Sequence, residues 1–225
     1  VLRKATNIFF KSGPQGIRTW LGLGAANSYP QWVLKYAFLS KQDVSRIQKR
    51  IAEIKMTPRF SILMPTYNPD PAHLKAAIES VRAQLYPHWE LCIADDASTN
   101  PEVAQILEKY LRLDERIKVT FRGKNGHISA ASNSALELCT GEFTALLDHD
   151  DELTPHALYL ITEEIFANPE ADLIYSDEDK LDAAGKLEFP HFKSDWNPDL
   201  FYSQNYLNHL TTIRTRILTE IGGFR

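Results

Sequence analysis

From Phe60 onward, the chain alternates short apolar runs with segments of helical periodicity, and this alternation constrains the fold more than any other feature. Strands that alternate with helices are joined by right-handed crossovers into a mainly parallel sheet. Pro71, Pro101 and Pro155 stand where the first turns of three intervening helices would begin. The sequence therefore predicts an α/β fold, with a Rossmann-like sheet flanked by helices. The predicted strands are residues 60–65, 89–94, 117–121, 143–147 and 173–175.

Polar residues follow each predicted strand directly. In open α/β sheets, ligands bind at the carboxyl ends of the strands, so we expect these residues to gather along one edge. One such cluster could be an accident of a loop, but five along one edge predict a binding site. The clusters are Thr66-Tyr67-Asn68, Asp95-Asp96, Lys124-Asn125, Asp148 to Asp151, and Ser176 to Asp179.

The acidic cluster Asp148-His149-Asp150-Asp151 follows an apolar strand and is hard to explain by packing. Like charges in a row repel one another unless a cation lies among them. Asp148 and Asp150 would point the same way from an extended segment. Hard oxygen ligands of this kind suit Mg²⁺ or Mn²⁺. His149 would point to the opposite side and is not expected to bind the metal. The alternative interpretation is a solvated acidic turn before the next helix.

Composition excludes several classes of protein. The net charge of −4 over 225 residues leaves no basic surface for nucleic acid. Cys92 and Cys139 lack metal-ligand spacing, and we interpret them as small core residues in a reducing compartment. No run of 18 apolar residues predicts a membrane span, and no secretory signal is recognised.

Residues 1–58 differ from the rest and predict an N-terminal extension to a main domain at residues 59–225. Gly22-x-Gly24 resembles a dinucleotide fingerprint, but no strand precedes it and its third glycine is missing. Residues 44–54 repeat isoleucine and valine at helical spacing, which predicts an amphipathic helix leading into the domain. Five aromatic residues are expected to dock onto the main domain: Trp20, Tyr29, Trp32, Tyr36 and Phe38.

Taken in order and spacing, several motifs resemble family 2 glycosyltransferases of the GT-A fold. Two of these motifs, Tyr175 to Lys180 and Gly222-Gly223-Phe224-Arg225, are similar to those of bacterial polysaccharide and O-antigen glycosyltransferases in particular. The motifs are Pro65-Thr66-Tyr67-Asn68, Asp95-Asp96-Ala97-Ser98, Asn125-Gly126 with Ala131 and Asn133, Leu147 to Asp151, Tyr175 to Lys180, and Gly222-Gly223-Phe224-Arg225.

The resemblance implies transfer of a sugar from a nucleotide diphosphate to a hydroxyl group, usually with inversion. A hexosyl or rhamnosyl group would move from a UDP- or dTDP-sugar to a glycan or lipid-linked saccharide, with Mg²⁺ or Mn²⁺ as cofactor. We therefore expect a cytoplasmic location, with peripheral association at the inner face of the membrane left open. The donor sugar, the acceptor and the oligomeric state are not predicted.

By the same resemblance, Asp150 is the metal ligand, and Asp148 contacts the ribose or the metal through water. Asp96 would accept a hydrogen bond from the ring N–H of uracil or thymine, with Asp95 as the rival assignment. Asp151 is as readily explained as a carboxylate near the start of a helix. The residues expected to pack around the base are Pro65, Thr66 and Tyr67.

Two further residues of the polar clusters carry open assignments. Lys124 could reach a phosphate or the base, or simply be solvated. Asn68 could be structural, since asparagine before proline favours a turn.

Three consecutive acidic residues after the fifth predicted strand are the candidate catalytic residues. Asp177, Glu178 and Asp179 are candidates to face the donor sugar or the acceptor; the alternative is a charged β-hairpin with its turn at residues 182–185. In the family, an aspartate after the Gly-Gly-Phe motif is the general base, so we expect that base beyond Arg225. Most residues of the irregular region where acceptors bind in the family are expected to pack; they are His191, Trp196, Tyr202 and His209.

Two other functions compete with this interpretation. A sugar nucleotidyltransferase would need a glycine-rich, basic loop after the first strand, and residues 66–70 have neither property. A non-catalytic nucleotide-sugar or carbohydrate-binding module is the second alternative. A chain that binds a donor without transferring the sugar would belong to that class.

Overall fold

The computed structural model describes residues 28–182 and 184–225. The chain divides into two compact units. The sheet unit contains residues 41–175 and 209–225, and the hairpin unit contains residues 28–40 and 176–208 of the described chain. Trp20 and the Gly22-x-Gly24 segment lie outside the described residues, and a domain boundary at residue 58 stays a prediction.

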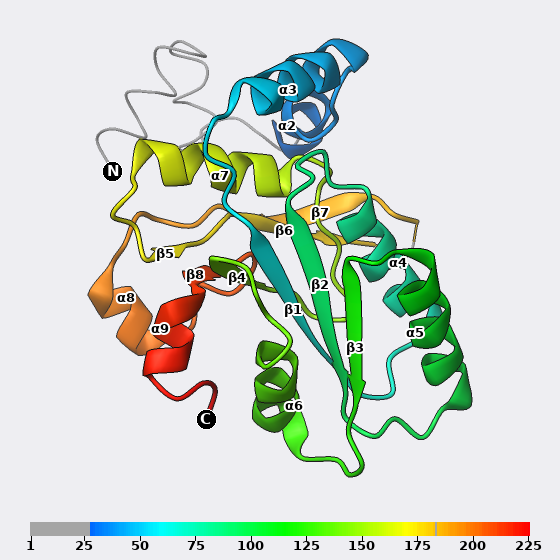
Figure 1. The fold of residues 1–225 in the computed structure, drawn as a ribbon. Helices are drawn as coiled ribbons and strands as arrows, with labels where there is room; N and C mark the ends of the chain where they lie inside the picture. The colour runs from blue at the N-terminus through cyan, green and yellow to red at the C-terminus, as the bar shows by residue number, and fades with distance from the viewer. Residues whose placement is uncertain (1–27, 183) are drawn as a thin grey trace. The chain divides into compact units, whose positions relative to one another are not determined.

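The sheet unit is built on a six-stranded sheet with the order β3-β2-β1-β4-β8-β5 (Figure 1). Four neighbouring strands are parallel: β1 (Phe60–Thr66), β2 (Trp89–Asp95), β3 (Ile117–Phe121) and β4 (Phe143–Leu146). The predicted mainly parallel sheet is therefore confirmed. The sequence did not predict β8 (Thr212–Arg214), which runs antiparallel between β4 and β5 (Leu173–Ile174).

Pro71 and Pro101 begin their helices as the sequence predicted, whereas the helix after Pro155 begins only at Ala157. Asp70 accepts a hydrogen bond from the backbone of Ala72, and Asn100 accepts one from Glu102, each with proline next in the chain. The helix after β1 ends at Arg82. The helices of the sheet unit are α3 (Lys41–Glu53), α4 (Pro71–Arg82), α5 (Pro101–Leu113), α6 (His127–Leu136), α7 (Ala157–Ala167) and α9 (Thr215–Glu220).

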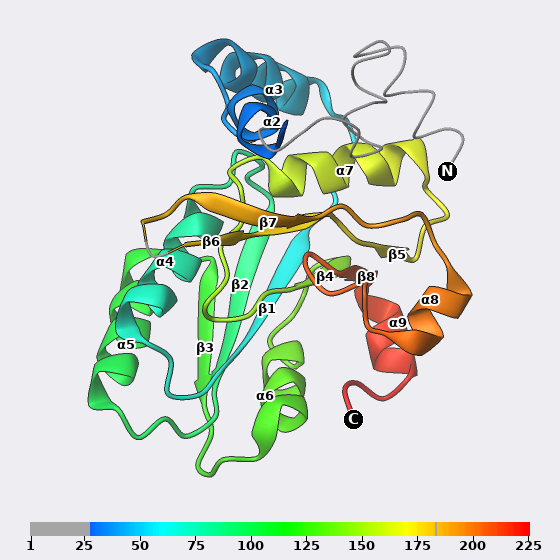
Figure 2. The same ribbon diagram turned by 180° about the vertical axis from the view of Figure 1, so that it is seen from behind.

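Alternate residues of β1 enter two different hydrophobic clusters. Ile62 and Met64 belong to the larger cluster, which α4, α5 and α7 complete. Leu63 belongs to a smaller cluster with Ala94 and with Ala135 of α6. Helices thus cover both faces of the sheet, and α6 covers the second face at the carboxyl ends of β1 and β2 (Figures 1 and 2).

One charged side chain is fully buried in the sheet. Glu90 of β2 has no exposed surface, and its carboxylate accepts hydrogen bonds from Ser61 at 2.6 Å and from the backbone N–H of Thr140 at 2.6 Å. It also pairs with Arg59 at 2.8 Å and Lys118 at 2.9 Å. Burial by itself would raise the pKa of Glu90, but these donors outweigh it and hold the pKa at about 2.

The hairpin unit contains α2 (Ser28–Tyr36), α8 (Pro198–Ser203) and an antiparallel pair, β6 (Glu178–Leu181) and β7 (Leu187–His191). The two hairpin strands run alongside each other in Figure 2. Asp182 caps their turn by accepting hydrogen bonds from the backbones of Ala184 and Lys186. The charged hairpin that the sequence offered as an alternative is therefore present. Tyr29 and Trp32 of α2 contact Phe192 within this unit.

Of the helices within residues 28–182 and 184–225, none has both the length and the apolar character that a membrane crossing needs.

Candidate functional site

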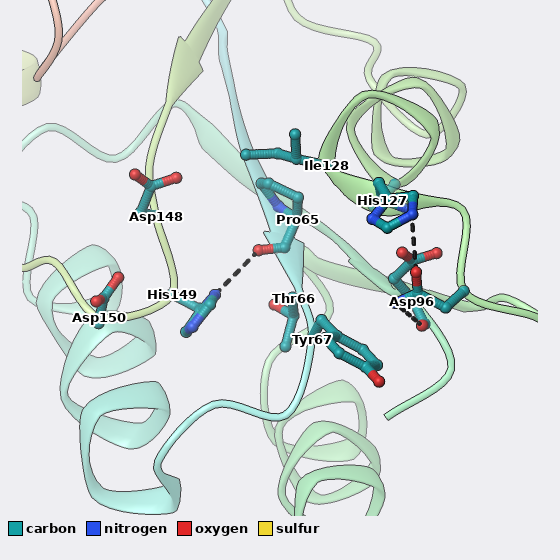
Figure 3. Close-up of a pocket in the computed structure, with 11 residues that line it drawn as sticks. Pro65, Thr66, Tyr67, Asp96, His127, Ile128, Asp148, His149 and Asp150 are labelled. Carbon is teal, nitrogen blue, oxygen red and sulfur yellow. Dashed lines mark hydrogen bonds between the residues drawn. The ribbon is translucent and has the colours of Figure 1, made fainter. Parts of the chain in front are cut away.

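A pocket of about 520 Å³ lies at the carboxyl ends of β1, β2 and β4, beside the start of α6 (Figure 3). Four of the five predicted polar clusters contribute to it, and all of its lining belongs to the sheet unit. Lys124 and Asp95 do not line it. The lining residues are Pro65, Thr66, Tyr67, Asp96, Asn125, His127, Ile128, Ala131, Asp148, His149 and Asp150.

Asp96 forms one side of the pocket and is held by groups that the sequence did not indicate. Its side chain is almost fully buried, and Oδ1 accepts a hydrogen bond from Nε of Arg122 at 2.7 Å. The backbone N–H of Gly126 lies 3.0 Å from both carboxylate oxygens. Arg122 also donates to the carbonyl oxygen of Ala130 at 3.0 Å. The carboxylate is thus fixed in direction and paired with a cation.

The neighbouring Asp95 does not line the pocket. Its Oδ2 accepts a hydrogen bond from the backbone of Ser98 at 3.1 Å, and its Oδ1 is buried without a partner among the described residues. Of the two rival candidates for contacting a base, only Asp96 lines the pocket. Thr66, which does line it, has a buried hydroxyl with no hydrogen-bond partner in the described part of the chain. Such a group is normally satisfied by water or a ligand.

Asn68 joins the two loops that follow β1 and β2. Its side-chain oxygen accepts hydrogen bonds from the backbone of Thr99 at 2.8 Å and of Asn100 at 3.3 Å. Its own backbone N–H donates to the Ser98 hydroxyl at 2.8 Å. The left-handed φ of +45° is tolerated by asparagine. These contacts support the structural explanation of Asn68.

The acidic side of the pocket lies across from Asp96. Figure 3 shows Asp148 and Asp150 at one side and Asp96 at the other, with Pro65, Thr66 and Tyr67 between them. The ring of His149 lies 3.4 Å from the carbonyl oxygen of Pro65.

Asp148 also belongs to a second group of possible metal ligands. Single ligand atoms of Asp148, Asp151 and His209 all lie within 4.8 Å of one another, and His209 pairs with Asp151 at 3.2 Å. Carboxylate oxygens with an imidazole form a donor set that Mn²⁺ or Mg²⁺ can accept. Asp150 is not part of this group. The sequence did not link Asp151 to His209, because no local spacing relates residues so far apart.

The three candidate catalytic carboxylates lie in the hairpin unit and make contacts there. Asp177 accepts a hydrogen bond from the backbone of Lys193 at 2.7 Å, and Glu178 pairs with His191 at 3.0 Å and with Lys193 at 3.3 Å. Asp179 accepts a hydrogen bond from the hydroxyl of Tyr29. Burial lowers the pKa of Lys193, while Glu178 opposes that effect. These contacts explain the residues as supports of the hairpin, and a catalytic role for any of them stays a prediction.

Two other residues of the irregular region are only partly packed. Trp196 contacts Phe201 and Tyr206, yet it remains more than half exposed. Tyr202 is among the most exposed aromatic residues of the described chain.

Comparison with known proteins adds a family match and several relatives. The family model described as "Glycosyl transferase family 2" matches residues 61–223. An uncharacterized protein of Sinorhizobium fredii is 49% identical over 180 residues, and the O-antigen biosynthesis protein RfbC of Myxococcus xanthus is 36% identical over 197 residues. The matches cover 80% and 88% of this chain but only 20% and 15% of those relatives, so the chain spans a fifth of their length or less.

A similar solved structure is that of Staphylococcus aureus TarS in complex with UDP-GlcNAc. It has a TM-score of 0.61 and 25% sequence identity, over 74% of this chain and 48% of that one. The similarity covers the mixed α/β architecture with its mostly parallel central sheet.

Proposed function

The chain belongs to glycosyl transferase family 2, and from this premise we propose that its sheet unit binds a nucleotide-diphosphate sugar whose sugar is transferred to a hydroxyl group. One observation carries the proposal: a single pocket has a fixed, buried carboxylate on one side and a pair of aspartates on the other. The first suits recognition of a base, and the second suits a diphosphate held through a cation. The proposed acceptor is a glycan or a lipid-linked saccharide.

The base would lie at the Asp96 side of the pocket. Oδ1 of Asp96 already accepts from Arg122 and Gly126, while Oδ2 accepts from Gly126 alone. A carboxylate oxygen can accept two hydrogen bonds, so Oδ2 retains one for a ligand. The ring N3–H of uracil or thymine is a donor of the right kind, which favours UDP- or dTDP-sugars. The ring would pack against Pro65 and Tyr67.

The diphosphate would lie at the acidic side. The pocket lining contains three aspartates and neither lysine nor arginine, so an anionic diphosphate would be repelled there without a cation. Asp148 and Asp150 would hold Mg²⁺ or Mn²⁺, with Asp151 and His209 as the rival partners of Asp148. When bound, the cation supplies stabilisation of the charge that develops on the departing diphosphate.

We propose inversion at the anomeric carbon of a hexosyl or rhamnosyl group. The acceptor hydroxyl would attack on the face opposite the diphosphate, and its proton would pass to a general base. Asp177, Glu178 and Asp179 remain candidates to face the donor sugar or the acceptor. The nucleotide-sugar donor favours a cytoplasmic site of action, and cell fractionation with an antibody to this chain would test that location and any attachment to the inner face of the membrane.

Calorimetry of UDP binding tests the proposal. We expect binding in Mg²⁺ or Mn²⁺ that EDTA abolishes, and we expect Asp150→Asn to abolish it while circular dichroism and the melting temperature stay near those of the wild type. Glu115→Gln serves as the control, because it removes an exposed carboxylate that is not in the pocket. Equal affinity with EDTA and in Asp150→Asn would overturn metal-mediated binding.

A matching variant separates the two possible ligand sets. If Asp151 and His209 hold the cation with Asp148, Asp151→Asn will weaken UDP binding and Asp150→Asn will not. A product assay with UDP- and dTDP-sugars then tests transfer itself.

A further inference from the structure

His127 has a backbone conformation that its residue type does not favour. It is the first residue of α6, is exposed and lines the pocket. Its φ of +63° lies in the left-handed region, which glycine adopts freely and other L-residues adopt rarely. A glycine stands immediately before it, yet Gly126 has φ −129° and does not take the left-handed position.

Gly126 and His127 therefore need separate explanations. A Cβ atom at Gly126 would lie 2.7 Å from Nη2 of Arg122 and 2.9 Å from Cβ of Ala130, so lack of space explains that glycine. At His127, a glycine would satisfy the backbone without strain. Residues held in such conformations concentrate at ligand-binding sites, where the side chain itself is needed.

The ring of His127 has no hydrogen-bond partner within residues 28–182 and 184–225. Only its backbone N–H is bonded, to the side-chain oxygen of Asn125 at 3.2 Å. Apart from Tyr67, the ionisable residues of the pocket lining are histidines and aspartates, and the ring of the other histidine, His149, lies against Pro65. His127 thus offers a donor to the pocket that the fold does not use.

The position of His127 indicates which part of a nucleotide it would meet. The preceding N–H, of Gly126, lies 3.0 Å from both oxygens of Asp96. Figure 3 shows His127 and Asp96 on the same side of the pocket, across from Asp148 and Asp150. The ring is therefore at the side proposed for the base and away from the side proposed for the diphosphate.

We propose that a ring N–H of His127 donates a hydrogen bond to a carbonyl oxygen of the pyrimidine base, next to the N3–H that donates to Asp96. In uracil and thymine, a carbonyl group stands on each side of N3–H, so a donor beside an acceptor complements them. Cytosine lacks the N3–H. The inference rests on the proposed function and adds to it a second residue that selects the base.

The test replaces His127 with glycine in the whole chain. Because glycine adopts this backbone conformation freely, His127→Gly should melt within a few degrees of the wild type or above it. In the presence of Mg²⁺, its affinity for UDP should fall by about 3–10-fold, the usual effect of one hydrogen bond. Uridine, which has no phosphate, should compete with UDP less well by a similar factor, while affinity for inorganic pyrophosphate should not change.

Ala97→Gly is the matched control. Ala97 also has a left-handed φ, +61°, in the loop after β2, but does not line the pocket. The substitution relieves backbone strain without removing a pocket donor, so UDP affinity should stay within about twofold of the wild type. His127→Asp is a second variant, because aspartate tolerates this conformation and presents an acceptor in place of the donor. It should weaken uridine binding at least as much as glycine does.

Each failure has a distinct meaning. A wild-type chain that binds no UDP with Mg²⁺ overturns the proposed function. Normal UDP binding by folded His127→Gly and His127→Asp overturns only the role of His127. Loss of pyrophosphate affinity with unchanged uridine competition would place the ring at the diphosphate and overturn the base contact.

Discussion

Asp96 illustrates how much a single pocket residue depends on its support. Its carboxylate is buried, and a buried charge is stable only when it is paired and hydrogen-bonded. Arg122 provides the pairing and Gly126 the hydrogen bonds, so the fold itself fixes the direction of the Asp96 carboxylate. A preorganised acceptor of this kind loses less conformational entropy on binding than a mobile one.

We expect Asp96→Asn to reduce discrimination between bases. The wild type should bind UDP more tightly than CDP, because cytosine has no N3–H to donate. Losing a charge-assisted hydrogen bond typically costs about 1.5–3 kcal/mol, so the UDP-to-CDP affinity ratio should fall by at least an order of magnitude. The measurement is calorimetry with both nucleotides and Mg²⁺.

Asp114→Asn is the control for simple loss of an ion pair. Asp114 pairs with Arg116 at 2.8 Å and does not line the pocket. The Asp114→Asn substitution should lower the free energy of unfolding but leave the UDP-to-CDP affinity ratio unchanged. An unchanged ratio in Asp96→Asn would show that Asp96 does not contact the base.

At this scale, sequence reasoning predicted some pocket residues and not others for a physical reason. Thr66, Asp96 and Asp148 come directly at strand ends, and a parallel sheet brings such ends together. Arg122 and His127 depend on side-chain direction and on one unusual φ, which residue spacing does not determine.

Among the secondary-structure elements, β2 is held to its neighbours by a charge. Glu90 connects it to Ser61 of β1, to Lys118 of β3 and to Thr140 before β4. Its pKa in the folded chain is about 2, below the ordinary value of 4.5. The folded state therefore binds this proton less readily than the unfolded state does. The stability that follows is fully present above about pH 5 and is lost as the pH falls toward 2.

Glu90→Gln should weaken this dependence of the free energy of unfolding on pH. The pKa shift corresponds to stabilisation on the order of 3 kcal/mol at neutral pH. Urea unfolding at pH 3 and pH 7 should show a smaller difference in the variant than in the wild type, together with lower stability at pH 7. Glu108→Gln, an exposed helix residue, should leave the difference unchanged. The same slope in Glu90→Gln and wild type would contradict this account.

Helix α6 connects the pocket to the C-terminal segment. It begins with pocket residues, and its Asn133 bonds Phe224 twice: Oδ1 accepts from the backbone N–H at 2.8 Å and Nδ2 donates to the carbonyl oxygen at 2.9 Å. Gly223 has φ +81°, and a Cβ atom there would lie 2.3 Å from Oδ1 of Asn133. The Gly-Gly-Phe motif and Asn133 are therefore parts of one contact.

Asn133→Ala and Gly223→Ala should disrupt the same contact. We expect each to lower the free energy of unfolding by about 1–3 kcal/mol, and the double variant to lose less than the sum, because both changes remove one interaction. Urea unfolding of the three variants measures this. Ser132→Ala on the same helix is the control for the loss of a polar side chain from α6. Strict additivity would show that the two residues act independently.

The elements themselves were largely readable from sequence. Apolar runs, prolines and capping residues predicted β1 to β5 and their helices, because those signals are local. Strand β8 was missed because three residues, Thr212 to Arg214, carry no period of their own. Its place in the sheet comes from pairing with β4 and β5, which is a tertiary property.

For the whole molecule, the division into two units predicts which residues a bound nucleotide protects from hydrogen exchange. UDP with Mg²⁺ should slow hydrogen exchange at the pocket loops, residues 65–68, 95–99, 122–128 and 147–151, because binding stabilises the closed form of the groups it contacts. The hairpin turn at residues 184–186 should exchange as before. Mass spectrometry of exchanged peptides measures both, and protection confined to the hairpin would place the nucleotide elsewhere.

The late arrival of β8 has a consequence for synthesis on the ribosome. β4 and β5 are translated early, but the strand that lies between them is not made until the 33 residues from 176 to 208 have followed. Until then, one edge of β4 is unpaired and β5 lacks its partner, and such unpaired strand edges are sites of aggregation and chaperone binding. His209 emerges just ahead of β8, so its contact with Asp151 forms only when this last strand is inserted. Residues 176–208 are thus an insertion in the sequence of the sheet unit, and they are synthesised before the strand that closes the sheet.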